Sequence, residues 1–120
     1  ILEYAENKFF IIERTYQNGY GAYGNIIRIF EAEITLETTD VLGAGGLINS
    51  NFTPLTKRLL VNFEVFKAHL TEGIIDKIEG ITLVSVLENG NQSLVLVSDD
   101  NFQLYGKQLN QFILLEIVKE

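Results

Sequence analysis

Four residues at the ends of two apolar runs carry side chains that could bind a cation or move a proton. They are Glu79, Asp99, Asp100 and Asn101; Glu79 lies at the start of one run, and the other three follow the next run. Carboxylate and amide oxygens are the ligands that a hard cation such as calcium prefers, and a carboxylate can also serve as a general base. The structural alternatives are a strand-start carboxylate that caps backbone amides and ordinary turn formation.

Glu13 and Arg14 form a second candidate pair, because they follow the apolar run FFII in the first half of the chain. Glu13 would add a carboxylate ligand for a divalent cation. The Arg14 guanidinium can hold a phosphate or a carboxylate through two parallel hydrogen bonds. A simple ion pair, between these two side chains or with their neighbours, is the structural alternative.

Strands must position these residues, because helical periodicity is weak and short β-branched, aromatic and leucine-rich runs dominate. The sequence predicts seven strands, over 1–4, 8–15, 26–34, 57–66, 78–87, 93–98 and 110–118. Loops rich in glycine and asparagine separate them, and Asn89-Gly90 marks a hairpin. A long polar loop spans 36–56, and 67–76 has room for one helical turn.

The two halves of the chain repeat one pattern of strand, turn, strand ending in charge, loop and long strand. The first half then adds a fourth strand, and four antiparallel strands form one blade of a β-propeller. The predicted fold is therefore all-β and antiparallel, with one four-stranded blade over about 1–66 and three strands of another over about 78–118.

Antiparallel neighbours begin and end at the same edge of a sheet. The start of the innermost strand and the end of the next should therefore bring the candidate residues together at one mouth of the propeller channel. Clustered carboxylates repel one another at neutral pH, so they need a cation to be stable together. We expect either a divalent ion, with calcium as the leading choice, or an arginine–carboxylate pair involving Arg14.

Composition excludes several classes of function. The chain of 120 residues fits one domain, and 16 acidic against 9 basic residues argue against nucleic acid and anionic membranes as partners. No apolar run is long enough to predict membrane insertion. Cysteine is absent, which excludes disulfides and thiolate chemistry. The only histidine is His69, which argues against a zinc site.

The chain contains no methionine and begins inside the apolar segment ILEY. We therefore expect a processed chain or a piece of a longer protein. Incomplete blades expose sheet edges, and such edges tend to pair with other strands. The expected partner for this pairing is the rest of the parent chain or other copies of the same chain.

Four segments carry a family resemblance: FFIIER at 9–14, IEGI at 78–81, LVLVSDDNF at 94–102 and NQFILLEI at 110–117. In this order they resemble the C-terminal part of the family called esterase-like activity of phytase. The resemblance implies a phytase-like β-propeller, secreted or periplasmic, that hydrolyses phosphate or other small-molecule esters. Family members often carry asparagine at the position of Asp100, so this sequence departs from the pattern there.

For such a hydrolase we assign catalysis to Glu79, Asp99 and Arg14, and metal binding to Glu13, Glu79, Asp99, Asp100 and Asn101. Two other interpretations remain open. One is a non-catalytic propeller module that binds a ligand or a protein and holds a structural calcium. The other is a self-contained β-sandwich or barrel used for adhesion, against which the four-plus-three repeat counts.

Overall fold

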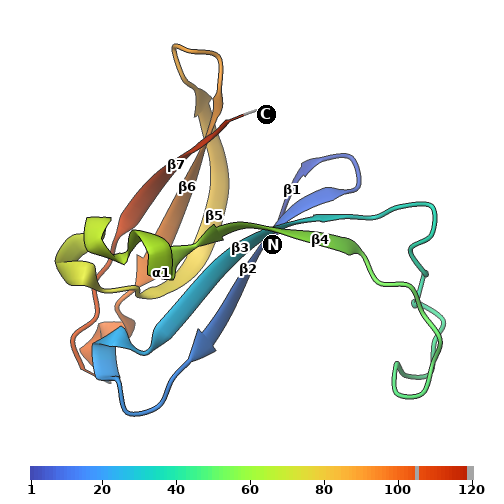
Figure 1. Cartoon of the computed structure of the whole chain (residues 1–120), viewed down its shortest axis with the longest axis horizontal. Helices are drawn as coiled ribbons and strands as arrows, with labels where there is room; N and C mark the ends of the chain where they lie inside the picture. The colour runs from blue at the N-terminus through green and yellow to red at the C-terminus, as the bar shows by residue number, and fades with distance from the viewer. Residues whose placement is uncertain (105, 119–120) are drawn as a thin grey trace.

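Two antiparallel sheets make up the protein (Figure 1), as seen in a computed structural model that describes residues 1–104 and 106–118. The first sheet has the order β1-β2-β3-β4, with bounds Leu2–Ala5, Lys8–Tyr16, Asn25–Glu33 and Thr56–Asn62. The second has the order β5-β6-β7, with bounds Lys77–Val86, Gln92–Asp99 and Phe112–Ile117. The predicted all-β fold, with four strands followed by three, is confirmed, and its strand order is that of partial propeller blades.

The predicted fourth strand is too long, because β4 ends at Asn62 and the helical turn α1 spans Phe63–Phe66. The Asn62 side chain caps this turn by accepting a hydrogen bond from the Glu64 amide at 3.2 Å. Phe63 then turns into the core, where only 1% of it is exposed. Short 3₁₀ turns follow at Lys67–His69 and Thr71–Gly73, with others at Gly21–Tyr23 and Asn101–Gln103. None of the described helices is long and apolar enough to cross a membrane.

A single apolar core joins the two sheets. The first sheet contributes side chains from β2 and β3, the second from β5 and β6, and the connection between the sheets adds two more. The buried set is Phe10, Ile27, Ile29, Phe63, Ile75, Ile78, Leu94 and Leu96. The sheets therefore pack face to face, and the segment after β4 seals part of their contact.

The loop between β3 and β4 projects away from both sheets (Figure 1). Its base is tied by paired bonds between Thr39 and Thr53, at 2.9 Å between backbone atoms and 2.8 Å from the Thr53 amide to the Thr39 hydroxyl. Several of its apolar side chains are exposed, among them Leu36, Leu42 and Ile48. The predicted long loop is thus an extension of the first sheet and covers no part of the core.

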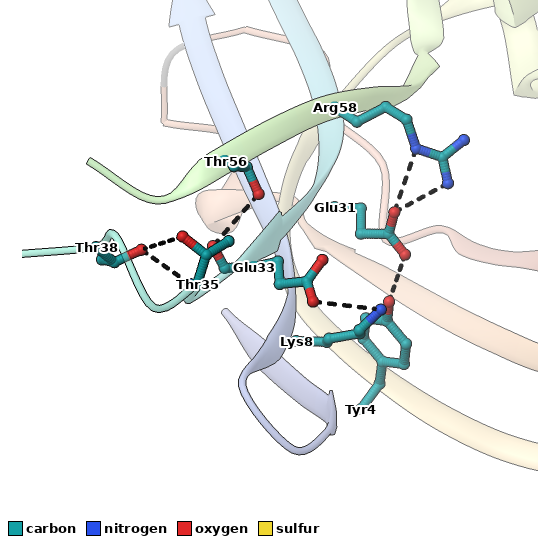
Figure 2. Close-up of polar contacts among 8 residues, drawn as sticks. All are labelled: Tyr4, Lys8, Glu31, Glu33, Thr35, Thr38, Thr56 and Arg58. Atoms are coloured by element: carbon teal, nitrogen blue, oxygen red, sulfur yellow. Dashed lines mark hydrogen bonds and ion pairs between the residues drawn. The ribbon is translucent and has the colours of Figure 1, made fainter. Parts of the chain in front are cut away.

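A polar cluster links the strands β1, β3 and β4 at one end of the first sheet (Figure 2). The Tyr4 hydroxyl donates to one oxygen of Glu31, and Arg58 donates to the other through Nε at 3.2 Å and Nη2 at 2.9 Å. Burial and the bond to Glu31 raise the pKa of Tyr4 to about 12. The bonds from Tyr4 and Arg58 lower the pKa of the Glu31 carboxyl.

The first prediction concerns the free edge of β7, which pairs with β6 and has no second neighbour among the described residues. We expect concentration-dependent self-association, because unpaired strand edges recruit other strands. Replacing the exposed Leu114 by lysine should weaken it, as measured by light scattering over a wide concentration range. Leu36→Lys, in the projecting loop, is the control, and a clean monomer throughout would contradict the prediction.

The second prediction concerns the Tyr4–Glu31 bond. Tyr4→Phe should lower the free energy of unfolding by about 1.5 kcal/mol, the lower range for a hydrogen bond to a charged group. Urea unfolding measures this, and Tyr20→Phe is the control because the Tyr20 ring is exposed. In an ultraviolet titration, the phenol that ionises near pH 12 in the wild type should be missing from the Tyr4 variant.

Candidate functional site

A pocket of about 340 Å³ lies where the two sheets meet, at the end where β2 finishes and β5 begins. Both sheets and two connecting segments supply its walls. The lining residues are Arg14, Tyr16, Gly21, Ala22, Asn25, Lys77, Lys107 and Gln108. Three of these side chains are cationic and, among these lining residues, none is acidic, so the pocket favours an anionic ligand.

Arg14 reaches this pocket because successive side chains of a strand point to opposite faces. Glu13, its neighbour in β2, forms an ion pair with Lys57 of β4 instead. Within the described part of the chain, the Arg14 guanidinium forms no ion pair or hydrogen bond. The two candidates therefore separate: Arg14 faces the pocket, and Glu13 stabilises the first sheet.

Lys77 and Lys107 complete the basic side of the pocket. Lys77 is the first residue of β5 and lies opposite Asp99, the last residue of β6. Lys107 forms an ion pair with Glu72, which belongs to the 3₁₀ turn that precedes β5. This ion pair links Lys107 to the connection between the two sheets.

Glu79 lies at a bulge near the start of β5. Ile78 pairs with Ser98 and Gly80 with Val97, so Glu79 is the extra residue on its strand. Bulges re-aim side chains, and the Glu79 side chain is exposed. A Cβ at position 80 would lie 2.5 Å from Cγ1 of Val97, so any larger residue there would force the Val97 side chain to move. Glu79 and Asp99 therefore lie at the same end of their strands, as the antiparallel geometry requires.

Asp99, Asp100 and Asn101 fix the turn after β6. Asp99 accepts from the Asn101 amide at 3.2 Å, and Asp100 accepts from the Phe102 amide at 3.1 Å. The Asn101 side chain donates back to the Asp99 carbonyl at 3.1 Å. These contacts are the turn-forming role that the sequence allowed as an alternative. They occupy one oxygen of each carboxylate, and the second oxygen accepts no hydrogen bond from the described residues.

The predicted ion-binding residues do not form a self-contained site. No group of three or more histidine, cysteine, aspartate or glutamate side chains in residues 1–104 and 106–118 could hold a metal ion. Glu13 is engaged by Lys57 on the opposite face of β2 from Arg14. The expectation of calcium stays a prediction, and the chemistry proposed below does not depend on it.

Asp76 is a buried carboxylate that the sequence analysis did not single out. Only 2% of it is exposed. Its Oδ2 accepts from the Leu109 amide at 2.9 Å and from Nε2 of Gln111 at 3.0 Å, while its Oδ1 has no partner among the described residues. Burial raises the pKa of Asp76, and the negative charge of Asp100 raises it further. The two hydrogen bonds lower the pKa but do not outweigh burial. Asp76 thus ties the start of β5 to the segment that carries Lys107 and Gln108.

Sequence reasoning found Arg14 in this site but missed the other polar lining residues. Lys77 and Asp76 precede an apolar run, a position that the sequence analysis used only for Glu79. Asn25 stands between a glycine-rich loop and an apolar run, which is also an ordinary strand start. Lys107 and Gln108 lie in an irregular segment with no periodic signal. Their convergence on one pocket follows from the packing of the two sheets.

The fold and the pocket define the class of protein: it is an all-β protein of blade-like antiparallel sheets with a basic pocket where the sheets meet. The family model described as Phytase-like, esterase-like activity of phytase, matches residues 1–102. The chain therefore belongs to this family, as its sequence motifs indicated. Comparison with curated proteins and with solved structures finds no significant match.

The third prediction concerns Asp76, whose pKa is raised above its ordinary value of 3.8 by burial. As pH rises above 3.8, the unfolded chain loses this proton before the folded protein does, so the unfolded state gains stability. The difference in unfolding free energy between wild type and Asp76→Asn should therefore become less favourable to wild type as pH rises from 3.5 to 7. Urea unfolding at several pH values measures it. Asp40→Asn, in the projecting loop, is the control, and an unchanged difference would contradict the prediction.

Proposed function

We propose that the protein hydrolyses esters with an anionic acid part, most of all phosphate esters, and that the pocket at the sheet junction holds this part. The observation that carries the proposal is the convergence of Arg14, Lys77 and Lys107 on one pocket in a chain of the phytase-like esterase family. Phosphoryl transfer needs little covalent chemistry from the protein. It needs positioning and neutralisation of the charge on the phosphate oxygens.

Arg14 is the residue best suited to orient the substrate. Its guanidinium carries a planar set of donors that fits two phosphate oxygens at once. Lys77 acts as a point charge on a remaining oxygen, and Lys107 adds a second positive charge that Glu72 offsets in part. Both lysines come from segments tied together by Asp76. Charge that develops on the phosphoryl oxygens during the reaction is then stabilised by donors already in place.

Glu79 and Asp99 are the proposed source of base catalysis. Both lie at the pocket end of β5 and β6, and Lys77 is two residues from Glu79 and opposite Asp99. A water oxygen forms a bond to phosphorus while the bond from phosphorus to the ester oxygen breaks. The carboxylate accepts the proton of the water, and the departing alcohol takes up a proton from solvent.

A non-catalytic binding module is the second candidate function. Asp99 and Asp100 each cap the turn at 101–103, which is a structural use of these acids. In this case the pocket binds an anionic ligand without turning it over. Turnover of an ester by the purified protein separates the two functions.

The fourth prediction tests the pocket directly. Arg14→Gln should lower kcat/KM for 4-nitrophenyl phosphate by about a hundred-fold, since it removes a charge-assisted pair of hydrogen bonds worth about 3 kcal/mol. Arg28→Gln is the matched control, because Arg28 is exposed on β3 and does not line the pocket. Release of 4-nitrophenol measures turnover, and 4-nitrophenyl acetate serves as an ester without an anionic acid part.

Two further arms complete this experiment. Glu79→Gln should lower kcat more than it raises KM, because it removes the base and leaves the basic pocket intact. Addition of EDTA or of calcium shows whether turnover depends on a divalent ion. Equal losses for Arg14→Gln and Arg28→Gln would overturn the pocket assignment, and no turnover of either ester would favour the binding module.

A further inference from the structure

Two buried carboxamides line the basic pocket. Asn25 is 3% exposed and Gln108 is 7% exposed. Neither Oδ1 of Asn25 nor Oε1 of Gln108 has a hydrogen-bond partner among the described residues. Buried polar groups without partners cost free energy and are rare in native proteins, so two at one pocket call for a cause.

The side-chain nitrogens are the ends of these two amides that a ligand can reach. Neither side-chain NH₂ group is among the buried unpaired atoms, and neither donates a hydrogen bond within the described part of the chain. The oxygens are therefore fully buried, whereas the NH₂ groups keep some exposed surface on residues that line the pocket. Rotating an amide by half a turn would exchange the two ends, but it would still leave one end unpaired. A ligand in the pocket would pair the pocket-facing end of each amide, which is the end that decides what these residues can bind.

The charge of the pocket decides which end the ligand meets. Arg14, Lys77 and Lys107 favour an anion, and an anion accepts hydrogen bonds. NH₂ groups are therefore the complementary ends of Asn25 and Gln108. With the amides in this orientation, every charged or amide group that lines the pocket is a donor.

We propose that Asn25 and Gln108 are binding residues that make the pocket select a tetrahedral oxyanion, the terminal phosphate of a monoester, over a planar carboxylate. The donors come from separate segments: β2, the start of β3, the start of β5 and the segment before β7. Donors that approach from several directions suit three terminal oxygens, whereas a carboxylate offers two oxygens in one plane. This inference rests on the proposed function for its choice of ligand, but its test needs no turnover.

The fifth prediction is that Asn25 and Gln108 contact bound phosphate. Nuclear magnetic resonance of ¹⁵N-labelled protein during titration with inorganic phosphate measures this. The side-chain NH₂ signals of Asn25 and Gln108 should shift as phosphate is added. Gln108→Met keeps the size and removes the donor, and Asn25→Asp keeps the shape and replaces NH₂ by an acceptor. Each variant should bind phosphate about ten-fold or more weakly, the loss of about one good hydrogen bond. Asn51→Asp, in the exposed projecting loop, makes the same charge change away from the pocket and should bind as wild type does.

The outcomes separate this inference from the proposed function. Acetate should bind more weakly than phosphate to the wild type, and equal binding would overturn the selectivity. Phosphate binding that Gln108→Met leaves unchanged, with no shift of the two amide signals, would overturn the role of these residues. Ester turnover without phosphate binding would contradict this inference and support the proposed function. Phosphate binding without ester turnover would support this inference and contradict the proposed function. Should Asn25→Asp fail to fold, the uncharged Gln108→Met and the wild-type amide signals still decide the result.

Discussion

Contact between the two sheets is the interaction on which the rest of the molecule depends. Phe10 and Ile29 from one sheet meet Leu94 and Leu96 from the other, and Phe63 closes the core from the connecting segment. Burial of one such side chain is worth about 1.5–3 kcal/mol. The shared core also sets the distance between β2 and β5. Because the pocket takes Arg14 from one and Lys77 from the other, its geometry follows from this apolar contact.

Polar contacts fix the same junction at the pocket end, where the apolar core stops. Asp76 accepts two hydrogen bonds from the segment before β7, and Gln111 donates to both Asp76 and the Ile74 carbonyl, the latter at 3.1 Å. A buried carboxylate is costly, as its raised pKa shows. Asp76 lies where the irregular segment before β7 carries the pocket residues Lys107 and Gln108. None of the described side chains of this segment belongs to the buried apolar core, so these hydrogen bonds contribute much of its attachment.

The strands were predictable because alternation and apolar runs are local properties. Glu79 and Asp99 were also correctly placed at one end of their strands, since antiparallel pairing alone decides it. The predicted end of the fourth strand was wrong, because Asn62 caps a helical turn in a segment whose composition resembles a strand. The basic pocket could not be predicted from the sequence. Asn25, Lys77 and Gln108 lie far apart in the chain and have no pattern in common, and only the sheet packing brings them together.

The net charge of the chain and the charge of the pocket lining point to different ligands. The chain carries a formal charge of −7, yet the lining residues of its pocket are cationic or neutral. Several acids of the first sheet are neutralised nearby, as in the pairs of Glu13 with Lys57 and of Glu31 with Arg58. At physiological salt, exposed charges beyond about 8 Å are largely screened. The preference of the pocket is therefore set by the few groups that line it, and an acidic protein can hold a site for an anion.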